Sequence, residues 1–192
     1  MKIAAVILAG GEGSRIGGDK PMRLLGETTL LDRAIDYASG LSDTVAVAVR
    51  DQQLGDTRVA IIRDDPTIDG PLAGLVAALH FAHNEGADAV LTLPTDMPFL
   101  PPELANRLAE GLASNRAAIA RSGGHLHPVC GLWLTAALDF VPEYLASGRR
   151  SLRGLAETVG YAVVDWPTDP EDPFFNINTS ADLVEAKRRT QR

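Results

Sequence analysis

Residues 3–22 read IAAVILAGGEGSRIGGDKPM. The first seven, Ile3 to Ala9, form a continuous apolar run, which is typical of a short strand buried on both faces of a parallel sheet. Five glycines, Arg15 and Lys20 follow. Glycines let successive backbone N–H groups turn toward an anion, and the two cations offer charge-assisted hydrogen bonds. The stretch predicts a strand that delivers a phosphate-binding loop, although a plain surface turn is the alternative.

Two familiar phosphate loops do not fit this stretch. The P-loop of nucleoside triphosphatases requires Gly-Lys-Ser or Gly-Lys-Thr, but Gly18 is followed by Asp19, Lys20 and Pro21. The dinucleotide fingerprint requires a third glycine where Ile16 stands. The loop therefore predicts a polyphosphate ligand, but neither a P-loop triphosphatase nor a dehydrogenase.

Strands and helices alternate along the rest of the chain. Alternation of this kind predicts an α/β fold with a mostly parallel sheet covered on both faces, and we expect one domain over residues 1–192. Thr29 with Asp32, and Thr179 with Asp182, resemble capping boxes at the starts of two helices. Further strands are expected at 43–49, 59–62, 87–93, 117–120, 127–134 and 161–164, with helices at 29–37, from 71, from 101, at 135–145, at 151–159 and from 179.

Bulk composition narrows the class of ligand. The formal net charge is −7, with 45% hydrophobic residues. An acidic chain argues against nucleic acid or an anionic membrane as partner, because both require a broad basic face. No apolar run reaches transmembrane length, and Cys130 is the single cysteine, so we expect a protein of the reducing cytoplasm.

Three polar segments follow expected strands. They are the glycine loop after the first strand, Arg63-Asp64-Asp65 after the third, and Pro94-Thr95-Asp96 after the fourth. In parallel α/β sheets the ligand lies at the carboxyl ends of the strands. We therefore expect these segments to share one cleft.

The stretch GGEGSRIGGDKP at residues 10–21 resembles the signature of nucleotidyltransferases with a Rossmann-like, three-layer nucleotide-diphospho-sugar transferase fold. Within that superfamily, LAGG followed closely by Asp19-Lys20 is most similar to the molybdenum cofactor guanylyltransferases. The resemblance spans roughly Val6 to Leu183. Its other motifs are Gly70-Pro71-Leu72-Ala73-Gly74, residues 94–102 (PTDMPFLPP), His127-Pro128, Arg149-Arg150 and Asn176-Ile177-Asn178-Thr179.

The resemblance implies attack by the terminal phosphate of molybdopterin, already carrying molybdenum or tungsten, on the α-phosphorus of GTP. Two anions must meet, so neutralisation of charge by Mg²⁺ is the main requirement. Asp96 is the implied metal ligand, with Asn178 as a second and Asn176 as its alternative. A helix cap or turn is the competing role for all three.

The resemblance assigns the triphosphate to two cations. Arg15 and Lys20 would hold it and stabilise charge as pyrophosphate leaves. The predicted nucleotide contacts along the first strand and its loop are Leu8, Ala9, Gly10, Gly11 and Gly13.

Asp64 matches the acidic residue of the family that contacts the nucleotide, and a strand-terminating turn is the competing role. One departure concerns the second strand, where the family often has an asparagine and this chain has Val47. A side-chain contact to the nucleotide is expected to be lost there, and a backbone contact is the alternative.

Four residues are predicted on the acceptor side by the same resemblance. Arg149 and Arg150 would hold the phosphate or the pterin, with a solvated turn as the alternative. His127 and Asn176 would complete the acceptor site.

Other functions remain open from the sequence. A molybdopterin cytidylyltransferase, or a sugar- or alcohol-phosphate nucleotidyltransferase, would share most motifs. A nucleotide sensor or cofactor carrier would bind without turnover. The resemblance further implies the molybdate-insertion enzyme and molybdoenzyme chaperones as partners.

Overall fold

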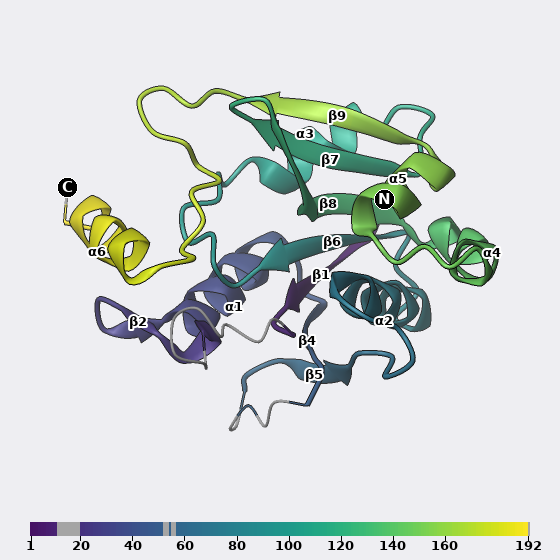
Figure 1. Ribbon diagram of the computed structural model, residues 1–192, viewed down its shortest axis with the longest axis horizontal. Helices are drawn as coiled ribbons and strands as arrows, with labels where there is room; N and C mark the ends of the chain where they lie inside the picture. Colours follow the sequence, from purple (N-terminus) through teal and green to yellow (C-terminus); the bar gives the residue numbers. More distant parts are fainter. Residues whose placement is uncertain (11–19, 52–53, 55–56, 192) are drawn as a thin grey trace.

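A seven-stranded sheet forms the centre of the molecule in the computed structural model, which describes residues 1–10, 20–51, 54 and 57–191 (Figure 1). The strand order is β5-β4-β1-β6-β8-β7-β9. The strands are β1 (Ile3–Leu8), β4 (Val45–Val49), β5 (Ala60–Arg63), β6 (Ala89–Pro94), β7 (Ala117–Ser122), β8 (His125–Leu134) and β9 (Tyr161–Trp166).

Parallel pairing joins β5, β4, β1 and β6, and it also joins β7 to β9. Only β8, among the described strands of this sheet, runs antiparallel to both neighbours. It follows β7 through Gly123 and Gly124, whose φ angles are 53° and 80°. A two-residue hairpin with positive φ at both positions strongly favours glycine, so this pair sets the reversal. The predicted α/β class with a mostly parallel sheet is confirmed.

Helices cover both faces of the sheet. Apolar residues of α1 (Leu30–Leu41) and α3 (Leu104–Gly111) pack on one face. Those of α2 (Pro71–Asn84), the 3-10 helix η3 (Thr135–Phe140), α4 (Val141–Ala146) and α5 (Leu152–Val159) pack on the other. The stretch 135–145 was expected as one helix and is η3 followed by α4. In β1, Ala4 to Ile7 are fully buried, as the apolar run predicts.

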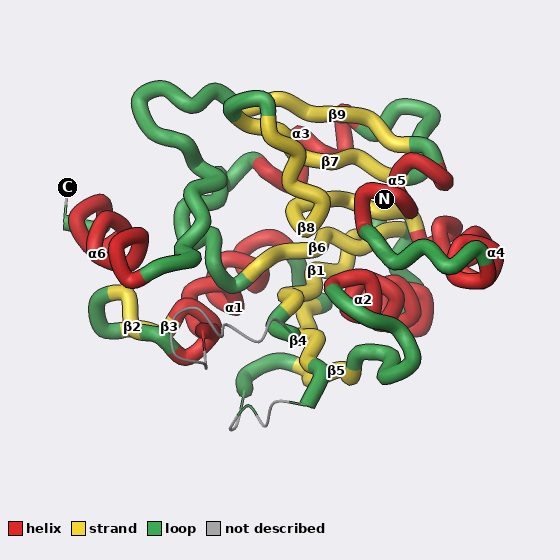
Figure 2. Tube along the Cα trace, viewed as in Figure 1, coloured by secondary structure: helices red, strands yellow, loops and turns green. Residues whose placement is uncertain are grey.

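The last helix, α6 (Ser180–Arg189), lies apart from the sheet beside the small hairpin of β2 (Leu24–Leu25) and β3 (Thr28–Thr29). Leu25, Leu30, Ile177 and Ala186 form a separate buried cluster between them. A long loop leads from β9 to α6 across the carboxyl edge of the sheet (Figure 2). The hairpin was not expected from sequence. No helix in the described part of the chain has the length and apolar character needed to cross a membrane.

Candidate functional site

The predicted metal ligands and one predicted cation meet in a single cluster. Lys20 Nζ lies 2.6 Å from Asp96 Oδ2 and 2.9 Å from Asn178 Oδ1. Lys20 begins the short 3-10 helix η2 (Lys20–Met22), Asp96 follows β6, and Asn178 precedes α6. The structure therefore joins three segments that are up to 158 residues apart in the chain. Two oxygen ligands around one cationic atom are placed to bind a single ion.

Backbone contacts hold Asn178 against Asp96. The N–H of Ile177 donates to the carbonyl of Asp96 at 2.9 Å. Asp182 Oδ2 accepts from the backbone N–H groups of Asn178 and Thr179, at 2.9 and 2.7 Å, in a complete capping box. The hydrogen bond from the Asn178 backbone is the main reason that the pKa of Asp182 is lowered. Both predicted capping boxes are confirmed, and this one also fixes the position of Asn178.

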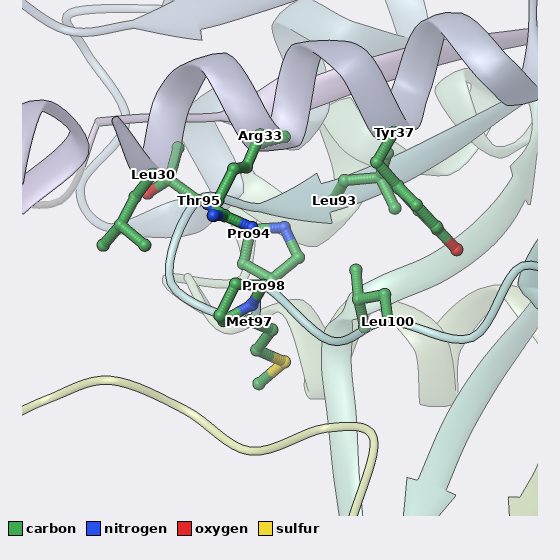
Figure 3. A pocket seen from close by; sticks show the side chains of 10 residues that line it. Leu30, Arg33, Tyr37, Leu93, Pro94, Thr95, Met97, Pro98 and Leu100 are labelled. Atoms are coloured by element: carbon green, nitrogen blue, oxygen red, sulfur yellow. The ribbon is translucent and has the colours of Figure 1, made fainter. Parts of the chain in front are cut away.

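The turn that carries Asp96 is braced from the side of α1. Figure 3 shows side chains of α1, including Leu30 and Tyr37, over the segment between Leu93 and Leu100. The Tyr37 hydroxyl donates to the carbonyl of Pro101 at 2.7 Å. The narrow cleft between these parts is lined mainly by apolar side chains. The side chains that line the cleft pack against the turn, and most of them have no polar group that could bind a phosphate.

Asp64 is a second acidic residue at the same sheet edge, and it is buried. It follows β5, is 9% exposed, and its Oδ1 is buried without a hydrogen-bond partner in the part of the chain that the structure describes. Burial raises the pKa of this carboxyl, while the charge of Arg50 acts in the opposite direction. An unpaired buried acceptor costs free energy unless a ligand supplies a donor.

Two glycines make room for this carboxylate. A Cβ at Gly10 would lie 2.7 Å from Asp64 Oδ2, and one at Gly74 would lie 3.4 Å from Asp64 Oδ1. Leu8 and Ala9 precede Gly10 at the end of β1, and Ala9 N–H donates to the Ala48 carbonyl at 2.8 Å. The structure thus brings Gly10, a predicted nucleotide contact, beside Asp64. Gly74 belongs to the Gly70–Gly74 motif, which supports the family resemblance, but it was not predicted as a site residue.

Three predicted residues, Gly11, Gly13 and Arg15, lie outside the described residues. Val47 is fully buried in β4, within the core on the α1 face of the sheet. Its side chain offers no polar group to a nucleotide, in line with the departure noted in the sequence.

His127 lies in β8 and is half-buried. Its Nε2 is 2.8 Å from the hydroxyl oxygen of Ser122, which also bonds Asp172. Asn176 lies on the loop before α6, and its Oδ1 is buried with no hydrogen-bond partner among the described residues. Ser122 and Asp172 were not predicted, because no motif in the sequence connects them.

Arg149 and Arg150 are not brought to this cluster. Arg149 bonds Thr158 and the carbonyl of Gly154, and Arg150 bonds the carbonyl of Leu145. These partners belong to α4 and α5, which lie at the other end of the molecule from α6 (Figure 1). The geometry supports a local structural role for both arginines and lends no support to the acceptor role.

The donor set around Asp96 suits Mg²⁺. Carboxylate and amide oxygens are hard ligands, and Mg²⁺ usually takes one or two carboxylates together with substrate phosphates and water. The described residues contain no group of three or more His, Cys, Asp or Glu side chains that could form a metal cage. A site completed by a nucleotide fits this arrangement better than a permanent structural metal.

Residues 5–160 match the family described as the MobA-like NTP transferase domain. The chain belongs to this family. Proteins named molybdenum cofactor guanylyltransferase from Nitrobacter hamburgensis and Acidiphilium cryptum are each 38% identical to it. The first alignment covers 95% of this chain and 92% of the relative, and the second covers 96% and 94%. The predicted membership of the nucleotidyltransferases, and the resemblance to guanylyltransferases among them, is confirmed.

Solved structures agree with this assignment. Molybdopterin-guanine dinucleotide biosynthesis protein A from Archaeoglobus fulgidus is 26% identical, with a TM-score of 0.77 over 100% of this chain and 99% of that one. The 2-C-methyl-D-erythritol 4-phosphate cytidylyltransferase from Thermus thermophilus has a TM-score of 0.72 at 19% identity, again over the full length of both. The latter likeness shows that the MobA-like chain shares its fold with other nucleotidyltransferases.

Proposed function

We propose that this chain transfers GMP from GTP to the terminal phosphate of molybdenum-bearing molybdopterin, forming the guanine dinucleotide cofactor and pyrophosphate. The observation that carries the proposal is the convergence of Lys20, Asp96 and Asn178 on one point. The relatives named molybdenum cofactor guanylyltransferase support the choice of substrates. In the same proposal the enzyme is cytoplasmic, and the molybdate-insertion enzyme and molybdoenzyme chaperones are its partners.

Asp96 and Asn178 would hold Mg²⁺ through the oxygens that now surround Lys20 Nζ. When bound, the ion neutralises the negative charge of the phosphates that must approach each other. The ammonium of Lys20 currently neutralises Asp96, and the Lys20 side chain is 13% exposed. Mg²⁺ and Lys20 therefore compete for the same carboxylate. Once released, Lys20 is free to hold the triphosphate.

The start of the glycine-rich loop would also bind the triphosphate. Gly10 lies two residues after the end of β1 and beside Asp64, so its backbone lies at the carboxyl edge of the sheet. We propose that Gly10, Gly11 and Gly13 direct backbone N–H groups at the phosphates and that Arg15 stabilises pyrophosphate as it leaves. These roles follow from the chemistry of glycine-rich cationic loops.

Asp64 would accept hydrogen bonds from the nucleoside part of GTP. Its buried Oδ1 can accept a hydrogen bond from an N–H or O–H group. A fully ionised triphosphate has no such donor. A guanine base offers N–H donors on its pairing edge, and its ribose offers hydroxyl groups. Asp64 therefore suits the nucleoside and would repel the phosphates. Leu8 and Ala9 line the same end of β1.

The acceptor would lie on the β8 side of Asp96. β8 runs antiparallel to β6 and pairs with it between Ala89↔Leu134 and Thr92↔Gly131. The residues of β8 before Gly131 therefore extend beyond Thr92, toward the carboxyl end of β6. His127 is among them. Asn176 lies on the loop that crosses to Asp96, with Ile177 bonded to the Asp96 carbonyl. We place the acceptor contacts at His127 and Asn176.

Two measurements test this function. Thermal unfolding with Mg²⁺ and GTP, CTP, UTP or ATP should show the largest stabilisation with GTP. Release of pyrophosphate should then require GTP, molybdenum-bearing molybdopterin and Mg²⁺ together. Preferential stabilisation by CTP or UTP would favour a cytidylyl or sugar-phosphate enzyme, and binding without release of pyrophosphate would favour a sensor or carrier.

A further inference from the structure

Three polar side chains from distant segments form a chain of hydrogen bonds at the carboxyl edge of the sheet. Ser122 ends β7, His127 lies near the start of β8, and Asp172 lies on the loop after β9. Ser122 Oγ is 2.8 Å from His127 Nε2 and 3.1 Å from Asp172 Oδ2. The other carboxylate oxygen, Oδ1, accepts from the backbone N–H of Phe174 at 2.9 Å. Ser122 is 2% exposed, so water does not replace these partners.

The hydroxyl of Ser122 has one proton to give. An ionised carboxylate only accepts, so Ser122 donates to Asp172 and its oxygen accepts from His127. The network therefore places the proton of the neutral imidazole on Nε2 and leaves a lone pair on Nδ1. Burial lowers the pKa of His127, against the opposing charge of Asp172, which favours this neutral form. Within the described residues, the hydrogen bond of this ring is the one at Nε2.

Aromatic packing fixes the plane of this ring. The imidazole of His127 stacks on Phe174 with centroids 4.7 Å apart and an interplanar angle of 6°. Phe174 in turn meets Trp166 in an edge contact at 5.3 Å, and the guanidinium of Arg107 lies 4.3 Å from the Trp166 ring centre. With one ring nitrogen bonded and the ring stacked, Nδ1 points in a fixed direction.

The same loop connects this cluster to the proposed metal site. After Asp172 and Phe174 it reaches Ile177, whose N–H bonds the Asp96 carbonyl, and then Asn178. The loop runs between β9 and α6 (Figure 1). His127 is thus tied to the reaction centre through a short, well-anchored stretch of chain, on the side where the acceptor is proposed to bind.

We infer that Nδ1 of His127 accepts a hydrogen bond from an N–H group on the heterocycle of the acceptor, and that Ser122 and Asp172 are positioning residues that fix the tautomer and the orientation of the ring. The inference rests on the proposed function. A lone pair would repel a phosphate dianion, and a phosphomonoester loses its second proton near pH 6, so at neutral pH the terminal phosphate offers no suitable donor. A fused nitrogen heterocycle such as a pterin does offer one.

Two substitutions at position 127 separate the roles of the two ring nitrogens. In His127→Asn the amide oxygen can reach the place of Nδ1, whereas in His127→Gln the amide reaches the place of Nε2. We expect His127→Gln and Ser122→Ala to weaken acceptor binding roughly three- to tenfold, as for one neutral hydrogen bond. His127→Asn also loses the bond to Ser122 but keeps an acceptor at the place of Nδ1, so it should weaken acceptor binding less than His127→Gln does. His125→Asn, at an exposed position on the same strand, is the matched control.

The readout is the dissociation constant of molybdenum-bearing molybdopterin, measured by the change in the protein's own tryptophan fluorescence, beside the KM values for GTP and acceptor. Thermal unfolding confirms that each variant folds. Asp172→Asn should shift acceptor binding in the same direction as Ser122→Ala, with the KM for GTP changed less than about twofold. Equal acceptor affinities for the Asn and Gln variants, or an unchanged affinity in Ser122→Ala, would overturn the inference. Failure of the proposed function would instead appear as no pyrophosphate release by the unchanged enzyme.

Discussion

The ammonium of Lys20 lies 2.6 Å from Asp96 Oδ2, and both side chains are mostly buried, at 13% and 20% exposure. A buried ion pair is costly to break by removing one partner, because the other charge is left without compensation. Here the lysine also reaches Asn178, so its ammonium occupies the position proposed for Mg²⁺. The free enzyme therefore has an internal cation that must give way before the metal binds.

Replacing the carboxylate should remove both metal binding and catalysis. We expect Asp96→Ala to lower turnover by at least about 100-fold, the scale seen when one electrostatic contact to a transition state is lost. Mg²⁺ should no longer strengthen GTP binding in this variant, as measured by calorimetry with and without the ion. Asp36→Ala removes an exposed carboxylate paired with Arg58 at 2.8 Å and is the control. Retained dependence on Mg²⁺ in Asp96→Ala would place the metal elsewhere.

Replacing the lysine should act on the triphosphate. Charged hydrogen bonds contribute roughly 1.5–3 kcal/mol, so Lys20→Ala should weaken GTP binding by about 10- to 100-fold and GMP binding much less. Mg²⁺ should also bind the nucleotide-free variant more tightly, because its competitor for Asp96 is gone. Lys2→Ala is the control, since the Lys2 ammonium bonds the carbonyl of Glu85 away from the site. Equal losses for GTP and GMP would contradict the role given to Lys20.

Much of this site could be predicted from sequence because its members sit at strand ends. Asp64 and Asp96 follow apolar runs, and parallel strands bring their carboxyl ends to one edge. The capping pattern at Thr179 and Asp182 also marked the helix start that holds Asn178. Local sequence patterns of this kind directly indicate where a strand ends or a helix begins.

No local sequence pattern indicated the hydrogen-bond chain of Ser122, His127 and Asp172. It depends on β8 running antiparallel between β6 and β7, and on a loop that returns across the sheet edge. Periodicity predicts elements but not the order of strands. For the same reason the two arginines before α5 were placed near the acceptor, although their contacts are with α4 and α5.

The buried carboxylate of Asp64 gives a prediction in which stability and binding move in opposite directions. Burial raises its pKa in the folded state, so the folded protein binds this proton more strongly, and stability falls as pH rises from the ordinary value of about 3.9 through the folded pKa. Asp64→Asn should therefore stabilise the free protein at pH 7 by on the order of 1 kcal/mol, because a neutral amide is less costly to bury.

The gain should disappear in acid, where Asp64 is protonated in both states. Urea unfolding at pH 7 and pH 3 measures the difference, and GTP affinity at pH 7 should fall in the same variant. Asp65→Asn is the comparison, since hydrogen bonds from Thr67 lower the pKa of that exposed carboxyl. A destabilised Asp64→Asn protein at pH 7 would show that the carboxylate has a partner in the free enzyme.

The capping box of α6 gives the last prediction, because it acts on the site and on stability together. Asp182 accepts from the backbone of Asn178, and its pKa is lowered chiefly by that bond. Its contribution to stability is therefore present above the ordinary carboxyl pKa and is lost as pH falls through the folded value. We expect Asp182→Ala to cost roughly 0.5–1 kcal/mol at pH 7 and much less at pH 3.

Asp32→Ala removes the equivalent box from α1 and should cost a similar amount. Only Asp182→Ala should weaken the effect of Mg²⁺ on GTP binding, because only that box fixes an oxygen next to Lys20. Urea unfolding and calorimetry on the two variants give the comparison. If both substitutions changed the effect of Mg²⁺ equally, Asn178 would not be a ligand positioned by its helix cap, and Asp96 alone would hold the ion from the protein side.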